Sequence, residues 1–170
     1  EIYVAAMGAL WGDNEERGVF KSIDGGQTWE KVLYVNQRTG CADLLMDPRN
    51  PSVLYASMWE FRRTGWSFDS GGENSALYKS IDGGKTWDKI HNGFPEGKLG
   101  RMGIAIAKSN PDVLYTVIEA EQKKDKGLYR SKDLGASWEQ MNNDFEITVR
   151  PFYFSRPVSY THLRAHETLQ

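Results

Sequence analysis

The feature that most constrains this chain is an eight-residue motif that occurs three times. It places serine, aspartate, glycine and a hydroxyl residue at every second position and ends on tryptophan. The copies span residues 22–29, 80–87 and 131–138. Self-similarity at a period of about 50 residues is typical of repeat architectures, in which each repeat is one supersecondary unit. We therefore expect one structural unit to recur along this chain.

The flanking sequence repeats with the motif. Strand-like segments begin shortly before each copy, at residues 18, 76 and 127, and an Asn-Pro-x-Val-Leu-Tyr block begins at Asn50 and again at Asn110. In the central unit the pattern predicts strands near 42–47, 53–58, 76–80 and 86–90. The segment 53–58 is largely apolar on both faces, which predicts a strand that is covered from both sides. Four short strands per repeat, covered by neighbouring repeats, are typical of a β-propeller blade.

We therefore predict an all-β fold, namely a fragment of a β-propeller made of four-stranded antiparallel blades. Residues 1–40 would form a partial blade with its second to fourth strands, 41–97 and 98–142 two complete blades, and 143–156 the start of another. Residues 157–170 match no earlier pattern and resemble translated sequencing-adaptor sequence, so we exclude them from the fold prediction. His162 and His166 in that segment have helical spacing, but no third metal ligand accompanies them.

The motif predicts a hairpin turn between the third and fourth strands of a blade. Its aspartate can accept backbone N–H bonds, and its second glycine stands where a positive φ is needed. Leu134 replaces the first glycine in the third copy, so we expect only the second glycine to be required. The tryptophan would anchor the following strand. The structural residues of the three copies are Ser22, Asp24, Gly26, Thr28, Trp29, Ser80, Asp82, Gly84, Thr86, Trp87, Ser131, Asp133, Gly135, Ser137 and Trp138.

This motif resembles the Asp-box, or BNR, repeat of sialidases, sortilin-type VPS10 propellers, Asp-box glycoside hydrolases and photosystem II assembly-factor propellers. The sequence around Trp11 and Trp66 is also similar to that of large bacterial proteins described as sortilin-like or BNR-repeat glycosyl hydrolases. The resemblance implies a propeller and a secreted or periplasmic parent protein. It does not imply a reaction, because the box occurs in enzymes and non-enzymes alike.

A ligand would bind on the loop face opposite the Asp boxes, where the connections between strands vary most in length and composition. The connection from Trp59 to Ser75 is the longest of them, and long loops are frequently functional. Its aromatic and arginine side chains suit sugar rings, peptides or an anionic group, although the aromatics could instead pack beneath the loop. The candidate ligand-binding residues are Trp59, Arg62, Arg63, Trp66, Trp11 and Arg17.

A glycoside hydrolase would need two carboxylates about 5–10 Å apart. The same loops supply Glu60, Asp69, Glu73, Asp13 and Glu16 as catalytic candidates, with Glu15, Glu119 and Glu121 as further acids. No pair stands out among them. A sialidase would also need an arginine cluster for its substrate's carboxylate; Arg62, Arg63 and Arg101 are present, but an Arg-Ile-Pro segment is absent from this sequence.

Composition excludes several other classes of function. The formal net charge of −2 gives no reason to expect nucleic acid as a partner, and the longest nearly apolar stretch, residues 2–11, is too short for a membrane-spanning helix.

Each box offers one carboxylate, whereas calcium takes about six to eight oxygen ligands, so we expect no metal and no cofactor. The segment 83–86 lacks the first glycine and the following helix of a phosphate-binding loop.

Three hypotheses about function remain. The first is a binding module for a glycan or polypeptide, the second is part of a sialidase- or glucanase-like glycoside hydrolase, and the third is a protein-assembly scaffold. In each case the remaining blades of the parent chain would be partners. Because this chain would expose blade faces and sheet edges, we expect it to self-associate or aggregate.

Overall fold

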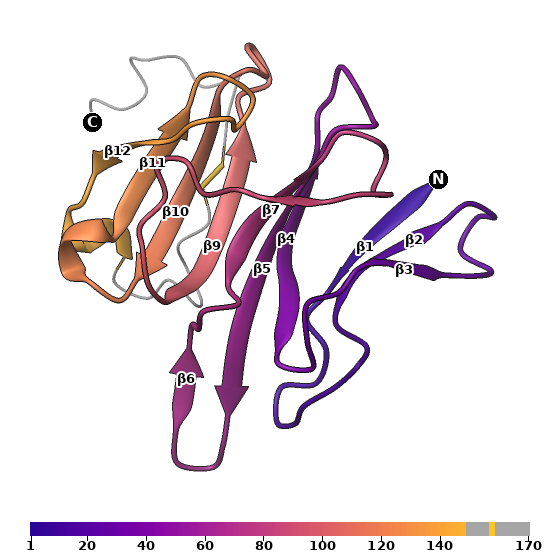
Figure 1. Ribbon diagram of the computed structural model, residues 1–170, viewed down its shortest axis with the longest axis horizontal. Coiled ribbons are helices and arrows are strands. Elements are labelled where there is room, and N and C mark those ends of the chain that lie inside the picture. The colour runs from indigo at the N-terminus through magenta and orange to yellow at the C-terminus, as the bar shows by residue number, and fades with distance from the viewer. Residues whose placement is uncertain (149–156, 159–170) are drawn as a thin grey trace, which may run out of the picture.

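The computed structural model describes residues 1–148 and 157–158, which fold into three antiparallel sheets packed in sequence order (Figure 1). The first sheet has the order β1 (Ile2–Ala6), β2 (Gly18–Ser22) and β3 (Glu30–Leu33). The second has the order β4 (Thr39–Met46), β5 (Leu54–Arg63), β7 (Ala76–Ser80) and β8 (Asp88–Lys89), with β6 (Phe68–Ser70) paired to the far end of β5.

The third sheet has the order β9 (Leu99–Ile106), β10 (Leu114–Ala120), β11 (Gly127–Ser131) and β12 (Glu139–Asn142). Two short 3-10 helices accompany it, η1 (Lys123–Asp125) and η2 (Phe145–Thr148). The prediction of an all-β chain with four-stranded antiparallel sheets is confirmed. The strand expected within 143–156 lies mostly outside the described residues, as do all but Pro157 and Val158 of the tail.

Strand positions in the central sheet differ from the prediction in two respects. β5 runs to Arg63, and β6 pairs back onto it, so the segment predicted as a long loop after Trp59 is a β-hairpin. β8 is only two residues long, which is shorter than the 86–90 strand predicted from the motif. The prediction that 53–58 is covered on both faces holds, since residues 54–59 are all buried.

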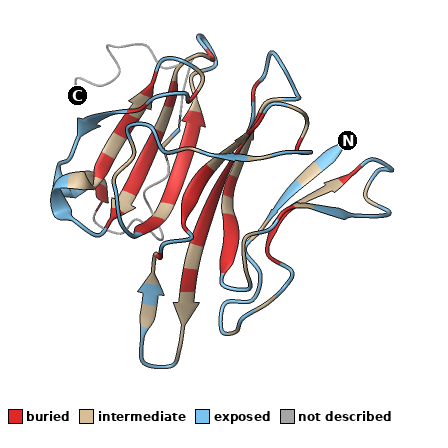
Figure 2. Cartoon of the chain, viewed as in Figure 1, coloured by how far each residue is buried: buried red, intermediate tan, exposed pale blue. Residues whose placement is uncertain are grey.

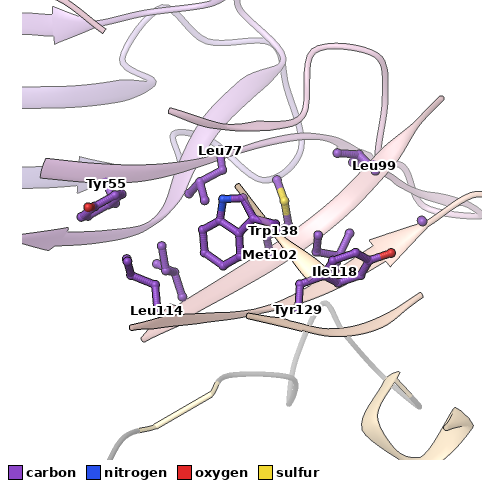
Figure 3. Close-up of a cluster of buried hydrophobic side chains, with 10 residues drawn as sticks. Tyr55, Leu77, Leu99, Met102, Leu114, Ile118, Tyr129 and Trp138 are labelled. Carbon is purple, nitrogen blue, oxygen red and sulfur yellow. The ribbon is translucent and has the colours of Figure 1, made fainter. Parts of the chain in front are cut away.

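The hydrophobic core lies between neighbouring sheets rather than within one of them (Figure 2). Tyr55 and Leu77 of the second sheet meet Met102, Leu114 and Trp138 of the third (Figure 3). A smaller cluster, which includes Val19, Ala56 and Met58, joins the first sheet to the second. Each sheet therefore depends on its neighbour for burial of its apolar face, as blades of a propeller do.

The Asp box is a closed network of hydrogen bonds that is the same in the first two copies; in the third, the Ala136 amide donates to the Asp133 backbone carbonyl instead of to the carboxylate. In the second copy, Ser80 Oγ donates to Asp82 Oδ1 at 2.8 Å and accepts from the Gly84 amide at 2.9 Å. Asp82 Oδ1 also accepts the amides of Lys85 and Thr86, both at 2.9 Å, and Oδ2 accepts the Thr86 hydroxyl at 2.6 Å. One carboxylate thus replaces the ladder hydrogen bonds that the tight turn cannot form.

These bonds stabilise the ionised carboxylates. Hydrogen bonding, first from the hydroxyl of Thr28 and Thr86 respectively, lowers the pKa of Asp24 and Asp82 well below its usual range. Hydrogen bonds, foremost from Ser137, lower the pKa of Asp133 to about 2. A group whose folded-state pKa is lowered stabilises the fold above its unfolded pKa of about 4 and loses that contribution as the pH falls toward the folded value.

A positive φ occurs at both glycine positions of the box, whereas the sequence analysis assigned it only to the second. Gly83 has a φ of 73° and its counterpart Leu134 has a φ of 59°; Leu134 is the only non-glycine residue with positive φ in the described part of the chain. The turn therefore requires a left-handed residue at both positions. Its hydrogen bonds hold Leu134 in a conformation that costs a branched side chain about 1–2 kcal/mol.

We predict that Gly83→Ala lowers the free energy of unfolding by about 1 kcal/mol, because alanine disfavours the left-handed backbone. A Cβ atom at Gly83 would meet nothing closer than the Tyr3 hydroxyl at 3.5 Å, so the cost is conformational rather than steric. Urea unfolding followed by tryptophan fluorescence measures it. Gly65→Ala is the control, since Gly65 has open space around it and no left-handed φ; equal effects of both substitutions would contradict this explanation.

Candidate functional site

The β5–β6 hairpin projects from the central sheet at the end opposite the Asp boxes (Figure 1). Trp59 and Phe61 alternate with Glu60 and Arg62 along β5, which is the period-two pattern of a strand with unlike faces. The turn is closed by the Thr64 amide, which donates to the Ser67 carbonyl at 2.9 Å. The hairpin is thus a structured extension of the blade.

Trp59 and Phe61 face inward and hold the hairpin to the body of the protein. Their rings stack with centroids 4.4 Å apart, and Phe68 of β6 meets Trp59 edge-on at 5.9 Å. Trp59 is 3% exposed and Phe61 is 1% exposed. The structure therefore gives Trp59, a predicted ligand-binding residue, a packing position beneath the hairpin.

Arg17, another predicted ligand-binding residue, is buried at the end of the β1–β2 loop. Its guanidinium donates to the carbonyls of Ala9 at 2.7 Å, Gly12 at 3.1 Å and Arg38 at 3.3 Å. It also lies 4.4 Å from the centre of the Phe61 ring. Burial lowers the pKa of this guanidinium. The carbonyl acceptors and the aromatic face replace part of its lost hydration, while its buried Nε has no hydrogen-bond partner among the described residues. Arg17 therefore organises the loop that carries Trp11.

Two of the predicted aromatic residues do reach the surface. Trp66 at the tip of the hairpin is 92% exposed, and Trp11 on the β1–β2 loop is 60% exposed. Arg63 lies between the β1–β2 loop and β6: its guanidinium is 5.7 Å from the centre of the Trp11 ring and 5.4 Å from that of the Phe68 ring. Arg62 pairs with Asp13 at 2.9 Å, which ties the hairpin to the loop of the preceding blade.

A polar cleft of about 640 Å³ opens at the base of the same hairpin. It is lined by residues of β6, of the segment that follows it, of β5 and of two neighbouring connections: Arg38, Glu60, Phe68, Asp69, Ser70, Gly71, Gly72, Glu73, Asn74 and Lys98. The cleft combines acids, bases and amides with one aromatic ring. Such a lining suits a hydroxylated, polar ligand better than an apolar one.

Three of the five predicted acids line one cleft, and the other two lie elsewhere on this face. Glu60, Asp69 and Glu73 line the cleft, Asp13 is held by Arg62, and Glu16 is exposed on the β1–β2 loop. Glu60 Oε2 accepts the side-chain amide of Asn74 at 2.9 Å and its backbone amide at 3.2 Å.

Glu119 of the third sheet contacts the segment at the base of the hairpin. Its Oε2 accepts the Ser70 hydroxyl at 2.7 Å and the Arg101 amide at 3.2 Å. Gly72 lies against the Glu60 carboxylate, since a Cβ atom added to Gly72 would overlap it. The Gly72 amide donates to the Leu99 carbonyl at 3.0 Å. The next residue, Gly100, lies equally close to the Glu119 carboxylate. Both carboxylates therefore lie along one short segment at the base of the hairpin.

Sequence reasoning missed the polar residues that complete the cleft, above all Arg38, Asn74 and Lys98. They come from three separate connections between strands, so only the tertiary arrangement places them together. Among the described residues, no three or more His, Cys, Asp or Glu side chains are arranged to hold a metal ion. No helix in this part of the chain is long and apolar enough to cross a membrane.

Comparison with known proteins identifies the same architecture. The family model described as "Sortilin, neurotensin receptor 3" matches residues 17–165. A sialidase from Bacteroides fragilis (strain YCH46) is 27% identical over 155 residues, which cover 74% of this chain and 28% of the sialidase.

Solved structures agree on the fold. The GH74 xyloglucanase from Xanthomonas campestris superposes with a TM-score of 0.56 at 20% identity, covering 76% of this chain and 18% of the xyloglucanase. An ancestral GH74 enzyme gives the same TM-score of 0.56 at 18% identity, covering 81% of this chain and 18% of that enzyme. The chain thus spans less than a third of the length of these relatives, and at such identities the likeness establishes the propeller fold alone.

We predict that Arg17→Met lowers the free energy of unfolding by about 2 kcal/mol, because it removes three charge-assisted hydrogen bonds from a buried guanidinium to loop carbonyls. Arg38→Met is the matched control, since Arg38 is exposed and the substitution keeps the backbone carbonyl that accepts from Arg17. Chemical denaturation of both variants measures the difference. A cost for Arg17→Met no larger than that of the control would mean that Arg17 does not organise the loop.

Proposed function

Because this chain belongs to the sortilin-Vps10 family of β-propeller proteins, we propose that it forms the part of a propeller whose hairpin face binds a glycan. The single observation that carries the proposal is the β5–β6 hairpin, which places the exposed Trp66 at its tip and a polar cleft at its base. A minimal four-stranded blade needs neither feature.

The chemistry of this face matches that of a sugar chain. An exposed indole offers a flat apolar surface to one face of a sugar ring, and Trp11 offers a second one on the neighbouring blade. Asp69, Asn74 and Lys98 in the cleft can exchange hydrogen bonds with hydroxyl groups. A relative described as a sialidase and a structural neighbour described as a xyloglucanase support a carbohydrate ligand.

A second candidate is that the parent protein hydrolyses glycans and that this segment supplies one or both carboxylates. The observation that favours it is the placement of Glu60 and Glu119, from neighbouring blades, along one segment at the base of the hairpin. Ser70 and Asn74 fix the orientation of these acids, as a positioned general acid or nucleophile requires. A parent protein outside the cytoplasm, secreted or periplasmic, would fit either candidate.

We expect Trp66→Ala to weaken binding of a xyloglucan oligosaccharide or of sialyllactose about tenfold, because a fully exposed indole is the main apolar contact available on this face. Titration calorimetry, supported by ligand-observed NMR, measures the affinity. Ile23→Ala is the matched control, since Ile23 is a 75% exposed apolar residue on an Asp-box turn.

Equal affinities of Trp66→Ala and the unaltered chain, or no binding of either probe, would contradict glycan recognition on this face. The hydrolase candidate is tested separately with Glu60→Gln and Glu119→Gln in the full-length parent protein. Loss of reducing-end release with retained oligosaccharide binding would favour catalysis, and unchanged release in both variants would exclude these acids from it.

A further inference from the structure

The second and third Asp boxes each dock onto the preceding blade through a carbonyl group of the box turn. In the second box, the Gly83 carbonyl accepts the Tyr3 hydroxyl at 2.9 Å and the Lys21 ammonium at 3.2 Å. Tyr3 lies opposite Lys21 across β1 and β2, so the two donors reach the carbonyl together. This contact is the joint between the first two blades.

The third box has the same joint with the second blade. Its Leu134 carbonyl accepts the Tyr55 hydroxyl at 2.8 Å and the Lys79 ammonium at 2.7 Å. Tyr55 lies opposite Lys79 across β5 and β7, which repeats the arrangement of the first joint.

Asn92 ties the third box to a second place, the connection from β8 to β9. The Trp138 amide donates to the Asn92 carbonyl at 3.2 Å, and the Asn92 side-chain amide donates to the Ala136 carbonyl at 3.3 Å. The ring of Phe94 meets the Trp138 ring edge-on, with centroids 5.4 Å apart. Two hydrogen bonds and an aromatic contact therefore hold this connection against the third box.

Asn92 is followed by Gly93, and this is the only Asn-Gly pair in the sequence. In such a pair the next backbone nitrogen can attack the side-chain carbonyl carbon, and glycine hinders that attack least because it has no side chain. Asn50 and Asn110 each precede a proline, whose nitrogen has no proton to lose. The sequence thus singles out Asn92 as the asparagine most susceptible to spontaneous deamidation.

The turn at Asn92 leaves both reacting groups open to solvent. The Phe94 amide donates to the His91 carbonyl at 3.1 Å, so Asn92 and Gly93 are the two central residues of a four-residue turn. Both are exposed. Gly93 has a φ of 80°, and its amide donates to no acceptor among the described residues. The Gly93 nitrogen is therefore free to lose its proton to solvent and to approach the Asn92 side chain.

We propose that Asn92 is a spontaneous modification site, and that its deamidation detaches the β8–β9 connection from the third Asp box. The Gly93 nitrogen forms a bond with the side-chain carbonyl carbon of Asn92, the bond from that carbon to the side-chain nitrogen breaks, and ammonia leaves with the amide proton. Water then opens the cyclic imide at one of its two carbonyl groups, which gives aspartate or isoaspartate at position 92. The steps consume one water and release one ammonia, with no oxidation or reduction.

Either product weakens the attachment of the connection. The side-chain amide that donates to Ala136 is replaced by a carboxylate, so two acceptors face each other. Isoaspartate also lengthens the backbone by one carbon and displaces the carbonyl that accepts the Trp138 amide. Gly93 lies so close to the Trp138 backbone that an added Cβ atom would overlap the Trp138 carbonyl oxygen, so the lengthened chain cannot keep that contact.

The Asp-Gly pairs of the first two boxes are protected from the same chemistry. Hydrogen bonds, first from the threonine hydroxyl of each box, lower the pKa of Asp24 and Asp82, and an ionised carboxylate is a poor target for a nucleophile. The Gly83 amide also donates to the Ser52 carbonyl at 2.9 Å, which holds its nitrogen in place. The modification is therefore confined to the connection and leaves these two box turns intact.

Peptide mass spectrometry of the chain during incubation in mildly alkaline buffer tests the site. Trypsin releases residues 90–98 with Asn92 as the only asparagine, and residues 50–62 and 109–123 as control peptides that contain Asn50 and Asn110. We expect the 90–98 peptide to gain the mass that marks replacement of an amide by an acid, at a rate close to that of the same segment as a free synthetic peptide. The control peptides should keep their mass. No gain in the folded chain, under conditions in which the free peptide deamidates, would overturn the proposal.

Hydrogen exchange at the Trp138 amide tests the consequence. We expect this amide to exchange about fivefold faster in the deamidated chain than in the fresh chain, which corresponds to the loss of one neutral hydrogen bond. The Gly84 amide of the second box is the internal reference and should not change.

Asn92→Gln is the matched control variant, since glutamine keeps a side-chain amide at this exposed turn but cyclises much more slowly through its longer side chain. Its Trp138 amide should keep its exchange rate through the same incubation. Unchanged Trp138 exchange in the deamidated chain, or an equal rise in incubated Asn92→Gln, would show that deamidation does not detach the connection.

Discussion

The structure depends on one aspartate carboxylate per blade, held inside a turn. Asp82 gathers two amides and two hydroxyls, and in doing so fixes the left-handed backbone at Gly83 and Gly84. That backbone directs the Gly83 carbonyl outward toward the preceding blade. A local solution to a tight turn therefore also sets the spacing and orientation between sheets, and the apolar clusters between the sheets fill the space so defined.

This arrangement places the joints between blades and the variable connections at opposite ends of the strands. The Asp-box ends of the strands form the joints between blades, so substitutions there affect the fold. The opposite ends carry connections that the joints do not constrain. The connection between β5 and β7 is one of these, and it contains the β5–β6 hairpin. Exposed tryptophan and a polar cleft can occupy that hairpin because Trp59 and Arg17 hold its base in place from beneath.

Much of the fold could be predicted from the sequence, because three copies of the repeat each indicate the same blade structure. The box geometry, the strand order within a blade and the burial of both faces of 54–59 could be predicted from spacing and alternation. The left-handed conformation of Leu134 could not, since a leucine at that position is a poor indicator of positive φ. The box turn imposes it, as it does at Gly25 and Gly83. The Leu134 carbonyl then accepts a hydrogen bond from Tyr55, 79 residues away in the chain.

The candidate site was less predictable for a related reason. The sequence identified the segment after Trp59 and its exposed Trp66, but it did not distinguish the buried Trp59 from the exposed Trp66, because both precede polar residues in an unrepeated segment. The cleft residues Arg38 and Lys98 come from connections on either side of the blade, and only the tertiary arrangement places them together. Repetition predicts what the blades share, whereas the site consists of what they do not share.

Amide hydrogen exchange tests the central claim, that the boxes are joints between blades, most directly. Gly26, Gly84 and Gly135 donate to their box serines at 2.8, 2.9 and 2.8 Å, so the turn alone would protect them equally. In a dilute, monomeric sample we predict that Gly84 and Gly135, whose boxes are docked, exchange much more slowly than Gly26, and that Tyr55→Phe speeds exchange at Gly135 without affecting Gly84. Equal protection of all three amides, unchanged by Tyr55→Phe, would contradict the account.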